Sequence, residues 1–555
     1  MGRRADRGAG LAGRGRAVAL AGFASLLAGP ALAQQDPTPA LIQQLEQRIE
    51  QFERETRVEQ TGDPVVSDPL QRADLPEPGG ATITLTAVEF EPRSEFISES
   101  ELQDIARQYV GRPIDFSEIA RLVRDVNDVY AIRGVVTASA ILPPQDLSDQ
   151  TLTVRLVEGR LGNVAIVGDR VTGNQTILDR VRLVKGEDGV VDVPTASRDI
   201  TFSNRTSQMQ MRMLLQPGAG FGLTDVSLGI TEPPRNQLSL YLDNQGVRST
   251  GEIGGGMIWR HYGALGIDDS FLAFVTGSEG SLAGTFSYDL PVSSYGTRLA
   301  VGYTGSRTKV VDGPSEPLGV RGGSHAATAT LTQALVARSD WLVQATASAS
   351  YILSESTVAG VPLVESDTVR VVMGLPISHV GERHSLYVQP QLIYANVTDT
   401  LAPGEPNEDY LILGGSGGAS YAFDGGFGAH LRGAWQYTEE NLLPGNLLFN
   451  IGGPTTVRGY PSDGVAGDSG YFVQAEISRR FDGDLEGLNV FAFTDVGEAF
   501  STFPARTTLV SAGVGMTYDF NGDAVLELSA GVPLREVIAD QATVTVLGRV
   551  TAKMP

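Results

Sequence analysis

The sequence predicts a mainly β protein, in which a transmembrane antiparallel β-barrel of about 16 strands follows two small α/β domains and an N-terminal helix. Two observations carry this prediction. From residue 236 onward, apolar and polar residues alternate without a helical block. No segment after the N-terminal leader reaches the ~18 uninterrupted apolar residues of a membrane helix, so a membrane-spanning region would be built from strands.

The composition excludes several kinds of site. The chain has 555 residues and no cysteine, which rules out a disulfide framework and a cysteine-ligated metal centre. Its five histidines lack a metal-binding spacing such as H-E-x-x-H, so we expect neither a metal site nor a cofactor. The formal net charge of −23 is the opposite of the basic footprint of a nucleic-acid-binding protein, so nucleic acid is not an expected partner.

Residues 1–33 have the three parts of a secretory signal peptide. Five arginines precede an apolar stretch over 17–27, and the tripeptide Ala-Leu-Ala ends at the expected cleavage site after Ala33. A membrane anchor is the alternative, but the apolar run is short and is interrupted by Ser25 and Pro30. Loss of five Arg and one Asp would change the net charge from −23 to −27. We therefore expect the mature chain to work outside the cytoplasm.

Residues 34–58 are predicted to contain one helix, and residues 59–81 a linker. Apolar residues recur at spacings near three and four over 38–58, with polar residues between them. A solvated helix or a coiled-coil strand is the alternative reading of this pattern. The linker carries repeated proline and glycine residues, which break regular structure. The helix is therefore expected to be tethered to the next domain.

Residues 82–159 and 160–234 are predicted to be two α/β domains in tandem. The first has the order β-α-α-β-β, with a capping box that begins at Ser98 before its first helix. The second repeats this order less clearly, with helical patterns near 174–184 and 195–206. Because the two segments have about the same length, we interpret them as a repeat.

Residues 235–555 are predicted to form the barrel. Between 343 and 351, apolar residues occupy the odd positions and polar residues the even ones. The same alternation recurs over 427–437, 473–480 and 542–553. A soluble β-sandwich alternates in the same way, but the length of this region without a helical block favours an outer-membrane barrel with a polar lumen.

The connections between the predicted strands fall into two groups. Short turns are expected at one end of the barrel, at 424–426, 482–484 and 521–522. Longer connections are expected at the other end, at 308–324, 399–409 and 442–470. The sequence G-G-S-G-G over 414–418 fits G-x-S-x-G, but no helix follows, so we expect a flexible turn there.

The most informative motif lies in the long connection. Val457-Arg458-Gly459-Tyr460 resembles the V-R-G-Y loop of polypeptide-transporting outer-membrane barrels. Among them the chain is most similar to the two-partner secretion transporters, the haemolysin secretion/activation family. Asp243-Asn244-Gln245-Gly246 is similar to this family's first barrel strand and turn. Pro144-Gln145-Asp146 and Val157-Glu158-Gly159-Arg160 together resemble the end of its first polypeptide-transport-associated (POTRA) domain.

The resemblance implies a transporter in the outer membrane of a Gram-negative bacterium. Two POTRA domains, 82–159 and 160–234, would capture an unfolded exoprotein in the periplasm, and the barrel would translocate it to the cell surface. The client would carry an N-terminal secretion domain, and the helix in 34–58 would plug the resting pore. Outer-membrane lipid and, during biogenesis, the barrel-assembly machinery are the other implied partners. Such transport needs no covalent chemistry, so we expect no catalytic residue and no enzyme.

The resemblance also implies how the long loop is held. In the family this loop folds back into the lumen, and an arginine inside a barrel needs a carboxylate partner. Asp495 matches the position that pairs with the motif arginine, here Arg458, and Glu476 on the polar face of its strand is the second candidate. Phe491 and Phe493 share the strand parity of Asp495.

Client capture is expected to use strand addition, in which an exposed sheet edge accepts an extended segment through main-chain hydrogen bonds. The predicted strands at 135–141 and 209–215 are the candidate edges. The candidate client-binding residues are Val135, Val136, Met211 and Met213.

Two other function classes remain open at this point. A barrel-assembly factor that inserts other β-barrel proteins shares POTRA domains and the V-R-G-Y loop, but usually carries more POTRA repeats. A diffusion porin or a lipase-type barrel enzyme is the weaker alternative. The two preceding α/β domains argue against a porin, and the absence of a plausible catalytic triad argues against an enzyme.

Overall fold

The structure is a computed structural model, and it describes residues 65–66, 79–313, 315–401, 406–462, 464–500, 506–537 and 541–554. The expected signal peptide and the expected helix in 34–58 lie outside the described residues, as does most of the expected linker. Within the described part of the chain, no helix is long and apolar enough to cross a membrane.

The first α/β unit, residues 79–158, packs two helices against one face of a small sheet. Helix α4 begins after Asp115, whose side chain accepts from the amide of Glu118, and it buries Leu122, Val126 and Tyr130. In the sheet, β6 lies in the middle, parallel to β3 and antiparallel to β5. The elements are β2 (Ile83–Thr84), β3 (Ala87–Glu91), α3 (Glu99–Ala106), β4 (Pro113–Ile114), α4 (Phe116–Ile132), β5 (Ala138–Ile141) and β6 (Thr151–Glu158).

The second α/β unit, residues 159–231, has the same arrangement. Its central strand β11 runs parallel to β7 and antiparallel to β10, as β6 does to β3 and β5. A short strand from the linker, β1 (Val65–Val66), pairs with the other side of β10. The elements are β7 (Arg160–Val167), α5 (Asn174–Leu178), β8 (Val184–Lys185), β9 (Val190–Val191), α6 (Val193–Thr206), β10 (Gln210–Pro217) and β11 (Leu223–Thr231).

One helix of the second unit is shorter than its pattern predicts. The expected helix near 174–184 ends at Leu178, and the chain passes through a turn at 179–180 and non-helical residues to β8. Val181 and Leu183 still enter the core of the unit. Their spacing therefore reflects burial of a non-helical segment, which periodicity alone did not separate from a helix.

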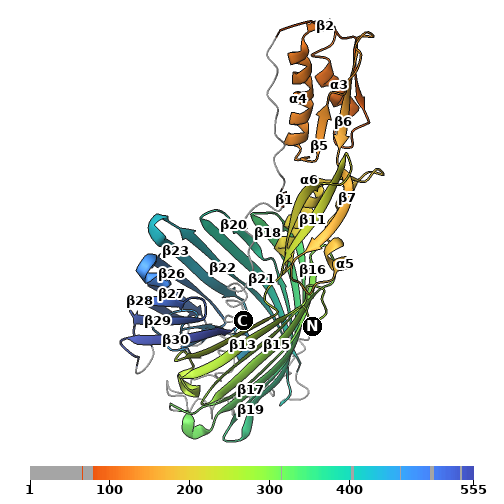
Figure 1. Ribbon diagram of the computed structural model, residues 1–555. Coiled ribbons are helices and arrows are strands. Elements are labelled where there is room, and N and C mark those ends of the chain that lie inside the picture. The colour runs from red at the N-terminus through yellow and green to blue at the C-terminus, as the bar shows by residue number, and fades with distance from the viewer. Residues whose placement is uncertain are drawn as a thin grey trace, which may run out of the picture.

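The remaining strands form a closed antiparallel barrel of sixteen strand positions, which confirms the predicted fold class (Figure 1). Strands β19 and β20 share one position, because both lie between β18 and β21 and are separated only at Leu375–Pro376. Strand β12 pairs with β30 and so closes the barrel.

The barrel strands run from β12 to β30, with β24 and β25 outside the wall. They are β12 (Asn236–Asp243), β13 (Gly254–Tyr262), β14 (Ser270–Ser278), β15 (Ser281–Pro291), β16 (Thr297–Lys309), β17 (Arg321–Ala337), β18 (Trp341–Val358), β19 (Val361–Gly374), β20 (Ile377–Val380), β21 (His384–Asp399), β22 (Glu408–Ala422), β23 (Phe427–Tyr437), β26 (Ser469–Arg480), β27 (Leu488–Phe500), β28 (Arg506–Phe520), β29 (Ala524–Pro533) and β30 (Thr545–Met554).

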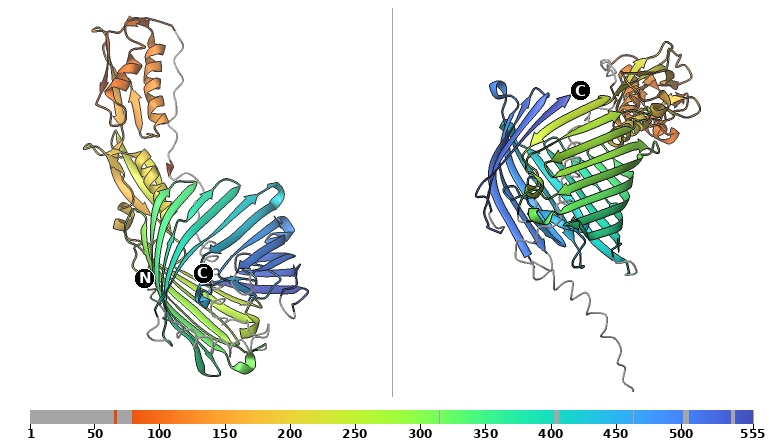
Figure 2. Two further views of the ribbon diagram at one scale, coloured as in Figure 1. Left: turned by 180° about the vertical axis from the view of Figure 1, so that it is seen from behind. Right: turned by 90° about the horizontal axis from the view of Figure 1, so that it is seen from below.

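The two α/β units extend from one end of the barrel (Figure 1). Seen from behind and from below, they lie beside the early strands of the barrel, at one side of its rim (Figure 2). The predicted short turns at 424–426, 482–484 and 521–522 lie at this end, and the long connection between β23 and β26 starts from the other end. Two-residue turns, between β14 and β15 and between β18 and β19, also lie at that other end.

One sequence interpretation inside the barrel is wrong. The glycine-rich segment 414–418 is not a turn but lies in the middle of β22. A side chain at Gly415 or Gly418 would collide with main-chain or aromatic atoms of the neighbouring strands, including the rings of Trp435 and Tyr387. The glycines therefore make room for packed aromatic side chains.

Candidate functional site

The connection between β23 and β26, residues 438–468, runs through the barrel interior. It contains a small hairpin of β24 (Phe449–Ile451) and β25 (Val465–Gly467). Asn446 contacts Thr368 on β19, while Thr545 on β30 donates to the carbonyl of Gly459. Strands β19 and β30 lie on opposite sides of the barrel in the strand order. We call this connection the lumen loop, because only a path across the lumen reaches both strands.

Arg458 in the lumen loop is held by two carboxylates of the barrel wall. Its Nε and one terminal nitrogen donate to the two oxygens of Asp495 at 2.8 and 2.9 Å, which is the bidentate geometry of a guanidinium with a carboxylate. Its other terminal nitrogen lies 3.0 Å from Glu476 Oε2. The amide of Arg458 also donates to Asp495, at 3.0 Å. Asp495 has no exposed side-chain surface, so it depends on this arginine for its counter-charge.

Two phenylalanines complete the environment of this arginine. The guanidinium carbon of Arg458 lies 3.7 Å from the ring centre of Phe493 and 5.9 Å from that of Phe491. Both rings therefore face the same side of β27 as Asp495, and they form cation–π contacts with the loop. Their shared parity with Asp495 reflects one inward-facing row of side chains that binds Arg458.

The other residues of the motif fix the tip of the lumen loop. Val457 is buried and packs against the backbone at Gly497, where an added Cβ would lie 2.8 Å from it. Gly459 has φ of +95°, a conformation that favours glycine. The hydroxyl of the buried Tyr460 lies 3.0 and 2.9 Å from the carbonyl oxygens of Val510 and Arg535, and it accepts from the amides of the same two residues. The four motif residues thus attach the loop to β27, β28 and the chain after β29.

A second arginine in the lumen was not among the predicted site residues. Arg432 on β23 donates to Gln474 on β26 at 3.0 Å and to the carbonyl of Thr455 in the lumen loop. Its guanidinium also lies over the ring of Phe472, 5.9 Å from the ring centre. The strand alternation places Arg432 on the lumen face. It does not identify Thr455 as a partner, because this residue reaches Arg432 only when the loop is folded.

The predicted client-binding residues fall into two groups. Val135 and Val136 precede β5, which begins at Ala138 and not at 135 as predicted, and Val135 is buried in the core of the first unit. Met211 and Met213 lie on β10, with their side chains in the core of the second unit. The outer edge of β10 is paired in parallel with β1, so that Val65 lies opposite Met213.

A buried polar cluster closes the first unit near its junction with the second. Glu158 accepts from the amide of Glu95 at 2.9 Å and from the hydroxyls of Ser94 and Tyr130 at 2.5 and 2.8 Å. Burial, together with the nearby Glu158 carboxylate, raises the pKa of Tyr130 above its ordinary value. The cluster thus joins the start of the unit to its last strand. Among the described residues, no three His, Asp or Glu side chains lie together as a metal site requires.

Comparison with known protein families identifies the architecture. The family model of the haemolysin secretion/activation protein ShlB/FhaC/HecB matches residues 222–518, which is more than half of the chain. The chain belongs to this family. The model of the ShlB-type POTRA domain matches residues 83–159, which is the first α/β unit.

Curated relatives of this chain include two named transporters. The outer membrane transporter CdiB of Dickeya dadantii (strain 3937) is 26% identical over 205 residues, covering 37% of this chain and 35% of the relative. The heme/hemopexin transporter protein HuxB of Haemophilus influenzae is 21% identical over 226 residues, covering 40% of each chain. The chain thus spans about a third to two fifths of the length of these relatives. These relatives and the barrel indicate a protein of the outer membrane.

Solved structures of similar fold cover nearly the whole chain. CdiB from Escherichia coli superposes with a TM-score of 0.69 at 19% identity, over 94% of this chain and all of that one. CdiB from Acinetobacter baumannii gives a TM-score of 0.64 at 18% identity, over 93% and 98% of the chains. BamA from Haemophilus ducreyi, lacking POTRA domains 1–3, gives 0.52 at 13% identity, over 85% and 100%. These likenesses establish the fold.

Proposed function

We propose that the protein is the transporter of a two-partner secretion system, which moves one unfolded exoprotein through its barrel to the cell surface. The observation that carries this proposal is the lumen loop, which crosses a closed barrel and is held to its wall by Arg458. The polar contacts between the loop and individual wall strands can break and form again while the hydrogen bonds between the strands keep the barrel folded. Membership of the haemolysin secretion/activation family and the transporter names of the relatives support the same role.

The periplasmic side is proposed to be the end that carries the two α/β units. An extended client segment would add to the outer edge of β10 through main-chain hydrogen bonds. This edge supports the proposal because it already accepts an extended strand, β1. Since β1 covers only the positions of Met213 and Leu214, a longer client strand would make more hydrogen bonds and displace it.

The remaining parts of the proposal concern the N-terminal region and the surroundings. The helix expected in 34–58 would plug the resting barrel and leave it on its linker when a client displaces β1. Outer-membrane lipid would surround the barrel, and the barrel-assembly machinery would insert it. Folding of the client outside the cell would drive transport, so the protein would need no catalytic residue.

The proposal predicts an exoprotein gene beside this one, and export of its product is the test. In cells that carry both genes, we expect Arg458→Ala to abolish surface export while a folded barrel remains in the outer membrane. Arg506→Ala, which removes an arginine that is 66% exposed and paired with Glu498, is the control and should export normally. Normal export by Arg458→Ala would contradict the role of the lumen loop.

The same strains separate transport from barrel assembly. If deletion of the gene blocks export of its partner alone, the transporter proposal stands. If deletion instead lowers the amounts of many outer-membrane barrels, the protein is an assembly factor. The likeness to BamA concerns the fold and does not favour that alternative.

A further inference from the structure

The second α/β unit is joined to the barrel at the turn between β13 and β14. Asp268 in this turn has no exposed side-chain surface, although it is a charged residue. Its Oδ1 accepts from the amides of Gln208 and Met209, both at 3.1 Å. These two residues immediately precede β10, the proposed client-docking strand. A carboxylate of the barrel therefore binds the start of that strand directly.

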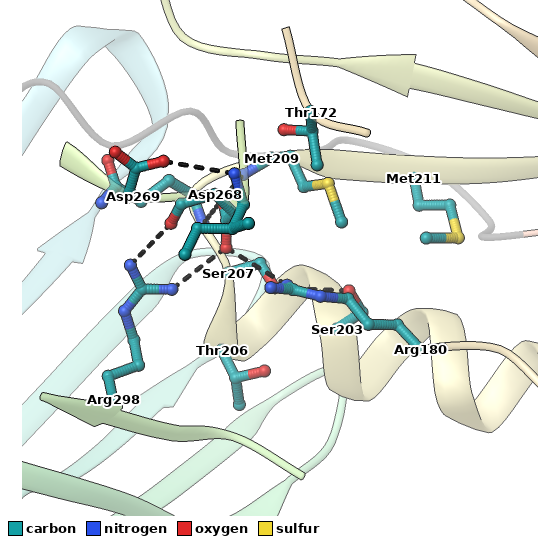
Figure 3. A network of polar contacts seen from close by, with 12 residues as sticks. Thr172, Arg180, Ser203, Thr206, Ser207, Met209, Met211, Asp268, Asp269 and Arg298 are labelled. Carbon is teal, nitrogen blue, oxygen red and sulfur yellow. Dashed lines mark hydrogen bonds and ion pairs between the residues drawn. The ribbon is translucent and has the colours of Figure 1, made fainter. Parts of the chain in front are cut away.

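Two arginines from different parts of the molecule neutralise the same carboxylate. Arg180 of the second unit lies 3.2 Å from Asp268 Oδ2, and Arg298 on β16 lies 3.0 Å from it. Arg298 also donates to the carbonyl of Asp268, at 2.9 Å, and pairs with Asp289 on β15. Figure 3 shows both guanidinium groups reaching the junction, with Asp268 and Ser207 between them. The second unit and the barrel thus share one buried ion cluster.

Further contacts surround this cluster on the barrel side. Asp269 accepts from the amides of Leu265 and Ile267 and from the hydroxyl of Tyr288, which holds the turn in shape. The carbonyl of Gly266 in the same turn accepts from the amide of Gly173 in the second unit, at 2.9 Å. The turn is therefore bound to the second unit through main chain as well as side chains.

The junction between the two α/β units is of a different kind. A main-chain hydrogen bond spans it beside the connector, from the amide of Gly159 to the carbonyl of Thr137 at 3.0 Å, and its charged side-chain contacts are exposed. Lys185 reaches across it to the carbonyl of Glu95 at 2.7 Å and over the ring of Phe96, in exposed surroundings. Arg155 of the first unit lies 5.8 Å from the ring centre of Phe221, which is 78% exposed. Exposed contacts of this sort hold geometry weakly, because water competes for each of them.

We infer that the second α/β unit and the barrel form one rigid body, in which Asp268 is the positioning residue that holds strand β10 at the entrance of the barrel. Movement during client capture then takes place between the two α/β units. The part that concerns the client rests on the proposed function, whereas the rigidity of the junction does not. A fixed docking strand would present every client segment to the same point of the rim.

Distance measurements between spin labels test this inference without a client. The chain has no cysteine, so labels can be placed at chosen sites in the full-length protein in lipid nanodiscs. One pair, Glu187→Cys with Ser339→Cys, joins the second unit to the turn after β17. The other pair, Arg121→Cys with Glu187→Cys, joins the two α/β units. All three positions are exposed.

We expect a single narrow distance distribution for the 187–339 pair and a broader one for the 121–187 pair. Asp268→Asn removes the charge at nearly the same side-chain size and should broaden the 187–339 distribution only. Asp312→Asn, at an exposed ion pair with Arg248, is the matched control and should change neither distribution. Asp268→Asn should also reduce export by a barrel that still inserts.

Two results would overturn the inference. One is a broad or multiple distribution for the 187–339 pair in the otherwise unaltered protein, a result that does not depend on whether any variant folds. The other is an unchanged narrow distribution in Asp268→Asn. A narrow 187–339 distribution in a protein that exports no partner would instead contradict the proposed function and leave the rigid junction standing.

Discussion

At the scale of single residues, Arg458 is the main contact between the lumen loop and the barrel wall. It combines a bidentate ion pair with Asp495, a contact to Glu476 and the face of Phe493. Its side chain is 13% exposed, so these interactions are only weakly screened by water. Breaking a buried pair of this kind costs about 3–5 kcal/mol, since the partner charge stays buried.

The aromatic part of this site can be tested separately from the charges. Phe493→Leu keeps an apolar side chain but removes the ring, and a cation–π contact in a desolvated site is worth about 2 kcal/mol. We expect the loop to leave the wall about thirtyfold more often, seen as more frequent open events in planar-bilayer recordings. Phe423→Leu changes an exposed residue in a turn, and its open events should be as frequent as those of the unaltered protein. Equal recordings for both variants would show that the ring does not hold the loop.

Only part of the surroundings of Arg458 could be predicted from the sequence. A carboxylate partner for Arg458 could be expected, because an arginine inside a barrel needs a counter-charge. The family resemblance implied Asp495 as this partner, and strand alternation offered Glu476 as the second candidate. Strand alternation gave no role to Phe491 and Phe493, because it records which face a residue shares and not what approaches that face. Arg432 was missed as a loop contact for the same reason, since Thr455 reaches it only when the loop is folded.

At the scale of elements, the closure of the barrel depends on a short pairing. Strands β12 and β30 pair over six positions, Leu238–Asp243 with Arg549–Met554. Side chains reinforce this seam, because Arg549 on β30 binds Asp243 on β12 at 3.1 Å and lies 3.7 Å from Glu527 on β29. Asn244 adds hydrogen bonds to the carbonyl of Val546 and the amide of Gly548. Asp243 and Asn244 therefore help to hold the two closing strands, β12 and β30, together.

Removal of the arginine should therefore weaken the closure. In Arg549→Met the buried carboxylate of Asp243 loses its ion pair with this arginine, and we expect a loss of about 3–5 kcal/mol in barrel stability. The measurement is the temperature at which the folded barrel converts to the unfolded band on a denaturing gel. Asp243→Asn in the same background should restore part of the loss, because it removes the uncompensated charge. Arg479→Met, at an exposed position, should convert at the parent temperature.

The edge of β10 allows a second test at this scale. Val65→Pro removes a main-chain donor from β1 and should free the β10 edge, because proline disfavours strand pairing. We expect tighter binding of the partner's secretion domain to the purified protein, measured by titration calorimetry. Val65→Ile keeps the strand and should bind as the parent does. Weaker binding by Val65→Pro would mean that β1 assists the client and does not compete with it.

Some elements lay beyond sequence reasoning for physical reasons. The alternation of long strands predicted the barrel wall, because one face must meet lipid and the other the lumen. The hairpin of β24 and β25 has only three residues in each strand, which is too short for a periodic pattern. The strand β1 has two residues and forms only because β10 offers an edge.

At the scale of the whole molecule, the parts of the structure are attached to one another in three different ways. The barrel and the second α/β unit are joined by one buried ion cluster, and each is held internally by its own ladders of main-chain hydrogen bonds. The lumen loop is attached to the wall mainly through side chains of the V-R-G-Y motif. The first unit contacts the second through exposed side chains and a main-chain hydrogen bond between Gly159 and Thr137. From these attachments we expect the barrel to open by movement of the lumen loop, while strand β10 stays in place.

The most direct test of this account is translocation by the purified protein. The transporter is inserted into proteoliposomes with the two α/β units outside, and the unfolded secretion domain of its genetic partner is added. We predict that the partner becomes protected from external protease, and that Arg458→Ala, inserted in equal amount, protects none. Partner that stays fully digestible with the parent protein, or is protected equally with Arg458→Ala, would contradict the account.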